Sequence, residues 1–92
     1  MKQVVAYHFW SPTCAPCKAI KPTIEDLKEE FSDVQWISVN THADTQGYAE
    51  KYGVSVVPTI VVVCGDSIER HSGTAVAGYY RILRNGIRVS QQ

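Results

Sequence analysis

The sequence predicts one small α/β domain in which three helices flank a mixed sheet of four strands. Three observations lead to this fold class. Apolar, β-rich runs alternate with a segment whose apolar residues recur at helical spacing. Two further β-rich runs are joined by a Gly-Asp pair that is typical of a hairpin. The length of 92 residues suits one domain, residues 1–92, with a buried core. The expected order is strand, helix, strand, helix, strand, strand, helix.

The first half of the chain contains two expected strands and one long helix between them. Residues 4–10 and 34–40 are rich in β-branched and aromatic side chains, which favour strands. Residues 15–31 place apolar side chains three or four positions apart, as on one face of a helix: Ile20, Ile24, Leu27 and Phe31. Pro22 lacks the amide hydrogen that a helical hydrogen bond needs. We therefore expect a kink in this helix.

The second half of the chain contains two expected helices and a hairpin. The expected elements are residues 43–52 (helix), 57–64 (strand), 67–72 (strand) and 74–85 (helix). Gly53 follows the first helix at the position that favours a left-handed C-cap. The pair Gly65-Asp66 predicts the hairpin turn, and Gly86 is expected to end the last helix. Residues 88–92 are then expected to be a frayed tail.

Charge and composition argue against several classes of function. Nine Lys and Arg balance nine Asp and Glu, and no basic stripe is evident, so nucleic acid and membrane surfaces are not expected partners. No apolar run approaches the length of a membrane span, and the N-terminus lacks the features of a signal peptide. Three cysteines are too few for the disulfide scaffold of a small secreted protein. We expect a cytoplasmic protein, or one in the host cytoplasm if its source is a virus.

The segment Cys14-Ala15-Pro16-Cys17 carries the chemistry that the sequence predicts. Two thiols separated by two residues at the start of a helix can close a small disulfide and reopen it. The N-terminus of a helix offers unpaired N–H groups and a partial positive charge, which lower the pKa of the first thiol. A metal site is not expected, because no second closely spaced pair of ligands occurs. This pattern predicts dithiol–disulfide exchange.

Several motifs at matching separations resemble the thioredoxin family over nearly the whole chain. They are Phe9-Trp10, Cys14-Ala15-Pro16-Cys17-Lys18, Pro22 in the following helix, Tyr52-Gly53-Val54 and Val57-Pro58-Thr59. The resemblance implies a thioredoxin fold. It also implies that Cys14 is the exposed attacking thiol and Cys17 the buried resolving thiol. It places a cis peptide bond before Pro58, and it gives these residues a substrate-binding role: Trp10, Ala15, Pro16, Val57, Pro58 and Gly73.

The chain departs from the family pattern at its N-terminus. Thioredoxins usually begin with an extra strand and helix, whereas only a few residues precede Val4 here. The strand at residues 34–40 is therefore expected at an edge of the sheet. Since an exposed apolar edge can pair with another chain, the protein is expected to be a monomer or a dimer through this edge.

A second departure lies beneath the expected active site. His8 stands where thioredoxins carry a buried aspartate that exchanges a proton with the resolving cysteine. The lysine that usually neighbours this aspartate is replaced by Ser38 or Val39. A neutral imidazole can accept a proton from Cys17, and a structural core histidine is the alternative. The sequence therefore gives His8 as a candidate catalytic residue.

The function predicted from these residues is thiol–disulfide oxidoreductase, acting as a protein-disulfide reductase in cell redox homeostasis. The expected partners are disulfide-containing proteins and an electron donor, either a thioredoxin reductase or a glutathione-type thiol. No bound cofactor is expected, because the Cys14–Cys17 dithiol carries the electrons itself. Two alternatives remain: a glutaredoxin-like, glutathione-dependent enzyme, and a thioredoxin-fold binding module without turnover. Cys64 ends an apolar strand and is expected to be a small core residue.

Overall fold

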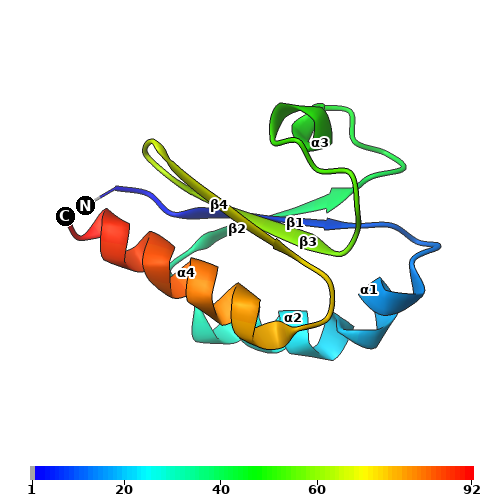
Figure 1. Cartoon of the computed structure of the whole chain (residues 1–92), viewed down its shortest axis with the longest axis horizontal. Helices are drawn as coiled ribbons and strands as arrows, with labels where there is room; N and C mark the ends of the chain where they lie inside the picture. Colours follow the sequence, from blue (N-terminus) through cyan, green and yellow to red (C-terminus); the bar gives the residue numbers. More distant parts are fainter. Residues whose placement is uncertain (1) are drawn as a thin grey trace.

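The computed structural model describes residues 2–92 and contains, within them, four strands and four helices (Figure 1). In chain order these are β1 (Val5–Trp10), α1 (Ala15–Ala19), α2 (Lys21–Glu30), β2 (Gln35–Asn40), α3 (Tyr48–Lys51), β3 (Thr59–Cys64), β4 (Ser67–Ser72) and α4 (Val76–Ser90). The predicted order of strands and helices is confirmed, with the first helix divided into two.

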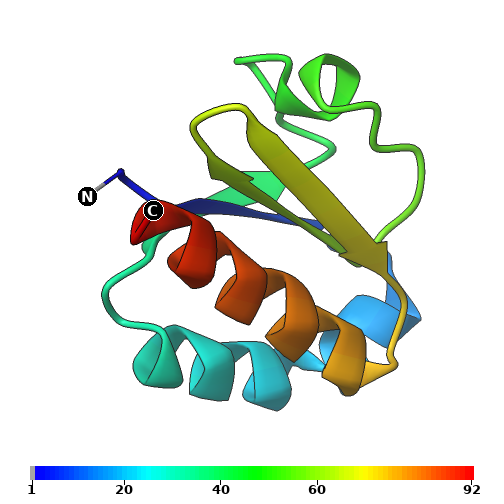
Figure 2. The same ribbon diagram turned by 60° about the vertical axis from the view of Figure 1, so that its left-hand side comes forward.

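The four strands form one mixed sheet in the order β2-β1-β3-β4. β1 pairs in parallel with β2, whereas β1–β3 and β3–β4 are antiparallel. α2 and α4 lie on one face of the sheet and α3 lies on the other (Figures 1 and 2). The predicted α/β class and mixed sheet are therefore confirmed, and β2 forms an edge of this sheet as expected.

The core consists of two apolar layers, one on each face of the sheet. The larger layer lies between the sheet and helices α2 and α4, and it includes Leu27 and Leu83. The smaller layer, on the α3 face, includes Tyr7 and Phe9 of β1. Because side chains alternate along a strand, His8 points to the α2 and α4 face, opposite to Tyr7 and Phe9. This alternation fixes the side of the sheet on which His8 can act.

The first helix is broken instead of kinked. α1 ends at Ala19 and α2 begins at Lys21, with Ile20 in a non-helical conformation between them (φ −96°, ψ 3°). Pro22 cannot donate the hydrogen bond that a continuous helix would direct to the carbonyl of Lys18. Proline is well tolerated in the first turn of a helix, so Pro22 starts α2 where it would have interrupted one long helix.

Two strand and helix boundaries in the middle of the chain differ from the predictions. α3 covers only four residues, because the carboxylate of Asp44 accepts hydrogen bonds from the N–H groups of Tyr48 and Ala49 and so sets a later start. β3 begins at Thr59 instead of residue 57. Pro58 has no N–H for a sheet hydrogen bond, which explains the later start of this strand. The left-handed Gly53 (φ 65°) agrees with its predicted place after the helix.

The predicted end of the last helix at Gly86 and the frayed tail at residues 88–92 are wrong. α4 continues through Gly86 to Ser90, whose carbonyl accepts the N–H of Lys2 at 3.2 Å. Ser90 is only 3% exposed. A Cβ atom on Gly86 would lie 2.7 Å from Cγ1 of Val62. Glycine at this position therefore lets α4 approach β3 closely and does not stop the helix.

Candidate functional site

Cys14 and Cys17 form a disulfide across the first turn of α1, with their Cα atoms 5.2 Å apart. Cys14 is the N-cap of this helix and has an extended backbone (φ −97°, ψ 105°). Its Sγ accepts a hydrogen bond from the N–H of Cys17 at 3.1 Å. The same N–H can stabilise a thiolate on Cys14 after the disulfide is reduced. This geometry supports reversible thiol–disulfide exchange.

The two cysteines do not differ in exposure in the oxidised protein. Each is 8% exposed, which contradicts the expectation of an exposed Cys14 beside a buried Cys17. Sγ–Sγ bonding holds both sulfurs against the first turn of α1, and the exposed residues there are Ala15 and Pro16. The two sulfurs are distinguished instead by the hydrogen bond, since only Cys14 accepts one from the backbone of the helix.

The peptide bond between Val57 and Pro58 is cis, as the resemblance implied. The carbonyl of Pro58 accepts a hydrogen bond from the N–H of Gly73 at 3.0 Å. Gly73 has a positive φ of 96°, which favours glycine, and it lies in the loop between β4 and α4. This loop, the start of β3 and α1 lie at the same end of the molecule (Figures 1 and 2). The fold thus brings three separate candidate segments to one end.

Tyr79 connects the two loops that carry Pro58 and Gly73. Its hydroxyl lies 2.5 Å from the carbonyl oxygen of Gly73 and 3.4 Å from that of Pro58. Burial raises the pKa of Tyr79 to about 12, so the hydroxyl remains a donor at all physiological pH values. From the sequence alone, this tyrosine is indistinguishable from one that only fills the core. Its only sequence signal is its position about two helical turns after Gly73.

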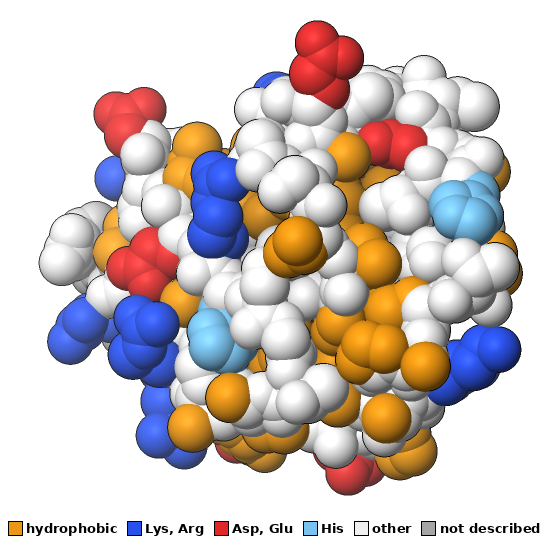
Figure 3. Space-filling view, turned by 45° about the vertical axis from the view of Figure 1, so that its right-hand side comes forward, with side chains coloured by type: hydrophobic (Ala, Val, Ile, Leu, Met, Phe, Trp, Pro, Cys, Tyr) orange, Lys and Arg blue, Asp and Glu red, His pale blue; other side chains and the backbone are white. Residues whose placement is uncertain are grey.

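The segment before Pro58 offers an apolar surface and a free backbone. Val56 is 56% exposed, an unusual value for a large apolar side chain. Within residues 2–92, neither the N–H nor the carbonyl of Val57 takes part in a hydrogen bond. Apolar side chains gather on the part of the surface that faces the viewer in Figure 3, and most charged side chains lie toward its periphery. Val56 was not identified from the sequence.

A pocket of about 440 Å³ lies beside Cys17 and brings several predicted residues together. His8, Trp10 and Cys17 line it, together with Ser38. The indole Nε1 of Trp10 donates a hydrogen bond of 2.8 Å to Oγ of Ser38. Ser38 is also the residue of β2 that lies opposite His8 in the sheet register. Ser38, and not Val39, is therefore the residue that pairs with His8 beneath the site.

His8 is held neutral by its surroundings. Burial, which is the largest effect, and the positive charge of Lys28 together lower the pKa of its imidazole to about 4, although Glu25 partly offsets them. Its Nε2 is buried and has no hydrogen-bond partner within residues 2–92. An unpartnered imidazole nitrogen can accept a proton. A thiolate nearby would raise the pKa of His8, because an anion favours the imidazolium form.

In the part of the chain that the structure describes, no metal site or membrane span accompanies the cysteine pair, and the third cysteine packs in the core. Among the described residues, no three His, Cys, Asp or Glu side chains lie close enough together to hold a metal ion. None of the described helices has the length and apolar character needed to cross a membrane. Cys64 is a free, buried cysteine at the end of β3 and packs in the larger core layer.

Comparison with known proteins identifies the family. A sequence model described as Thioredoxin matches residues 1–80. Thioredoxin of Bacillus subtilis is 39% identical over 74 residues, which cover 76% of this chain and 68% of that protein. Thioredoxin of Mycoplasma genitalium is 39% identical over 66% of this chain and 59% of its own length. These matches therefore span about three fifths to two thirds of the relatives.

Solved structures agree with this assignment. The structure of Fasciola hepatica thioredoxin has a TM-score of 0.80 and 25% identity, and the match covers 91% of this chain and 81% of that one. Spinach chloroplast thioredoxin f, in its short form, has a TM-score of 0.81 at 24% identity, with 92% and 77% covered, and so shows the shared fold. With its fold, its cysteine pair and its cis-proline in the matching arrangement, the chain belongs to the thioredoxin family.

Proposed function

We propose that this protein is a protein-disulfide reductase that cycles between a Cys14–Cys17 dithiol and disulfide. The observation that carries the proposal is the placement of Cys14 as the N-cap of α1, with the N–H of Cys17 directed at its sulfur. A thiolate in this position is stabilised at neutral pH and can attack a disulfide. The family assignment supports this chemistry.

The reaction transfers two electrons to the substrate in two displacement steps. The Cys14 thiolate attacks one sulfur of the substrate disulfide, forming a mixed disulfide and releasing the other substrate sulfur as a thiolate that takes up a proton. Cys17 loses its proton and attacks the Cys14 sulfur, which releases the second substrate thiolate. The substrate ends as a dithiol, and Cys14–Cys17 ends as a disulfide. No bound cofactor enters this balance.

His8 is proposed to accept the proton that Cys17 loses. Both residues line the same pocket, and the Nε2 of His8 is unpartnered. In the resting state, an imidazole with a pKa of about 4 is too weak a base to deprotonate the Cys17 thiol to a large extent. The pKa of His8 rises as negative charge develops on the sulfur of Cys17, so proton uptake by His8 accompanies the step in which Cys17 is deprotonated.

The substrate is proposed to lie along Val56, Val57 and Pro58. An extended segment of the substrate can pair with the free backbone groups of Val57, as a strand added to the protein. The exposed Val56, with Trp10, Ala15 and Pro16, offers apolar contact around the cysteines. Gly73 lies in the neighbouring loop and leaves room for the substrate backbone, since no atom lies within 4 Å of a Cβ built on it.

A cytoplasmic protein re-reduced by a thioredoxin reductase or a glutathione-type thiol is the proposed cellular setting. The Cys14–Cys17 disulfide needs a dithiol or thiol donor after each turnover, and bacterial thioredoxins are among the similar proteins. In such a setting the protein would contribute to cell redox homeostasis.

A monomer is proposed in preference to a dimer through β2. The outward-facing side chains of this edge strand are polar at Gln35 and Ser38, both of which are exposed. Trp36 is half-buried and donates its indole N–H to the carbonyl of Phe31 at 3.1 Å. Val34 and Val39 are buried, and Trp36 and Ile37 are half-buried, so this edge offers little apolar surface to a partner.

A Cys17→Ser variant tests the enzymatic function against the two alternatives. Without the resolving thiol, Cys14 should remain joined to substrate proteins in mixed disulfides, which mass spectrometry identifies after capture under non-reducing conditions. A matched Cys14→Ser variant should capture none. Capture of glutathione alone would favour the glutaredoxin-like enzyme. Retention of one partner by a variant that lacks both cysteines would establish a binding module instead.

A further inference from the structure

The balanced net charge of the chain conceals an uneven distribution. Residues 67–92 carry four arginines and a single glutamate, whereas residues 1–66 carry five lysines and eight carboxylates. α4 alone carries Arg81, Arg84 and Arg88 and has no acidic residue. The net charge of the whole chain therefore does not reveal that three arginines gather on this one helix. Side chains four and seven positions apart share one face of a helix.

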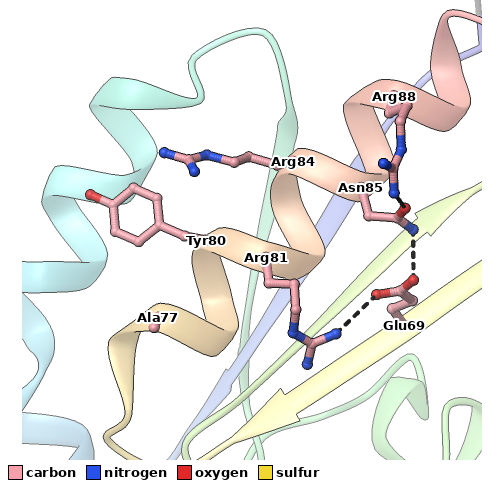
Figure 4. Close-up of a pocket in the computed structure, with 7 residues that line it drawn as sticks. All are labelled: Glu69, Ala77, Tyr80, Arg81, Arg84, Asn85 and Arg88. Carbon is pink, nitrogen blue, oxygen red and sulfur yellow. Dashed lines mark hydrogen bonds and ion pairs between the residues drawn. The ribbon is translucent and has the colours of Figure 1, made fainter.

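These arginines line one side of an open pocket of about 840 Å³ between α4 and β4. Figure 4 shows Arg81 directed toward Glu69 of β4 and Arg84 directed the opposite way, beside Tyr80. The guanidinium of Arg84 lies 5.5 Å from the centre of the Tyr80 ring, which is held in turn by a hydrogen bond of 3.0 Å to Glu30. Arg88 lies one further turn along and contacts Asn85. We name Arg81, Arg84 and Arg88 the α4 arginine strip.

Two of the three guanidinium groups are available to a ligand. Glu69 lies 3.9 Å from Arg81 and also accepts a hydrogen bond of 2.6 Å from Asn85. Within residues 2–92, neither Arg84 nor Arg88 forms an ion pair with a carboxylate. Arg84 is held against Tyr80 and Arg88 against Asn85, so both are partly oriented before a ligand binds. Oriented guanidinium groups are suited to binding carboxylates.

The shape of the strip favours an extended anion over a compact one. Arg81 and Arg88 are separated by seven residues, or about 10 Å along the helix axis. Glu69 pairs with Arg81 and with Asn85, the hydrogen-bond partner of Arg88, so it would repel a single phosphate placed between these two arginines. An acidic polypeptide segment can place separate carboxylates on Arg84 and Arg88 and avoid Glu69. Charge complementarity therefore points to an acidic segment of a protein.

The pocket that the strip lines extends toward the first turn of α4, near the proposed substrate groove. Ala77, which lines the same pocket, lies four residues after Gly73. The first turn of α4 lies at the same end of the molecule as α1 (Figures 1 and 2). We propose that the α4 arginine strip binds an acidic segment of the disulfide-containing protein substrate and so selects acidic substrates. This inference rests on the proposed function and names the substrate class for it.

The test compares two synthetic peptides that contain the same disulfide. One peptide carries a tail of six glutamates and the other a tail of six serines. The chemically reduced protein is mixed with each oxidised peptide, and the second-order rate of reduction is followed through tryptophan fluorescence at low and high salt. The wild-type protein should reduce the acidic peptide about tenfold faster than the neutral peptide at low salt, and the advantage should shrink as salt rises.

Charge-reversal variants locate the effect on α4. The double variant Arg84→Glu/Arg88→Glu should lose the advantage and reduce the neutral peptide at a rate within twofold of wild type. The milder Arg84→Gln/Arg88→Gln variant provides the same test if the charge reversal fails to fold. A control, Lys51→Glu, changes the net charge by the same amount as the glutamine variant, on α3 at the other face of the sheet, and should keep the advantage. Equal loss in the control, or no loss in either α4 variant, would overturn the proposal.

Two further outcomes separate this inference from its alternatives. Failure of the wild-type protein to reduce either peptide would contradict the proposed function itself, whereas equal reduction of both peptides would contradict only the role of the strip. A single-stranded oligonucleotide of equal charge is added as a competitor. A glutamate peptide without a disulfide serves as the second competitor. If the oligonucleotide suppressed the advantage of the acidic peptide at a lower concentration than this glutamate peptide does, the assignment to an acidic protein segment would be wrong.

Discussion

Acid should destabilise the oxidised protein through His8, and replacement of this residue should remove that contribution. The pKa of His8 is about 4 in the folded protein and 6.5 in an unfolded chain. The unfolded chain therefore binds more protons at pH values between these two, and the free energy of unfolding rises with pH over this window. Above pH 6.5 the buried, neutral His8 costs no stability. As the pH falls from 6.5 toward 4, the free energy of unfolding decreases, because only the unfolded chain binds the proton.

The size of the effect follows from the two pKa values. Each unit of difference corresponds to about 1.4 kcal/mol, so lowering the pH from about 7.5 to about 4.5 should cost about 2.5 kcal/mol of stability. Partial solvent access to the ring reduces this figure to about 2 kcal/mol. The oxidised protein is the form to use, because its active-site cysteines do not titrate.

The assay is urea unfolding of the wild type and of His8→Leu at both pH values. Subtracting one protein from the other cancels the contributions that they share and leaves the contribution of His8. The variant should be at least as stable as wild type at pH 7.5, because it removes a buried Nε2 without a partner. A pH dependence of equal size in both proteins would refute the argument that His8 is buried and neutral.

Three further predictions concern Tyr79, Gly86 and the β2 edge. Tyr79→Phe should cost about 1–2 kcal/mol and raise the KM for a peptide disulfide with little change in kcat, because the hydroxyl connects the loops of Pro58 and Gly73; unchanged urea unfolding would contradict this role. Gly86→Ala should lower the free energy of unfolding by about 1–3 kcal/mol, because the added methyl group overpacks against Val62. A gain in stability would show that α4 can shift away from β3 to make room for it. Sedimentation should give the mass of a monomer at micromolar concentration, and a concentration-dependent dimer would reopen pairing through β2.

The predictions that depended on local pattern agreed best with the structure. β4 and the turn at Gly65 follow from strict short-range preferences, and both strand limits are as predicted. The cysteine pair and cis-Pro58 were found because their motifs are contiguous in the sequence. These features need no knowledge of what packs against them.

The features that the sequence did not reveal depend on contacts between distant segments. Gly86 resembles a helix stop until β3 is placed beside it, when its missing side chain becomes the reason for close packing. Tyr79 resembles a core tyrosine until its hydroxyl is found between two loop carbonyls. Arg81, Arg84 and Arg88 were concealed by the balanced charge of the whole chain, because net charge carries no information on which face a residue occupies.

The redox equilibrium of the Cys14–Cys17 pair tests the central claim most directly. The protein is equilibrated with dithiol and glutathione buffers of defined potential, and the fraction oxidised is measured by thiol alkylation and mass spectrometry. A two-electron transition of one intramolecular disulfide, with a midpoint near the value of about −270 mV that is typical of thioredoxin, is the predicted result. A midpoint at or above about −200 mV would indicate glutathione-linked or oxidising chemistry instead. The absence of any Cys14–Cys17 transition would contradict the proposed catalytic cycle.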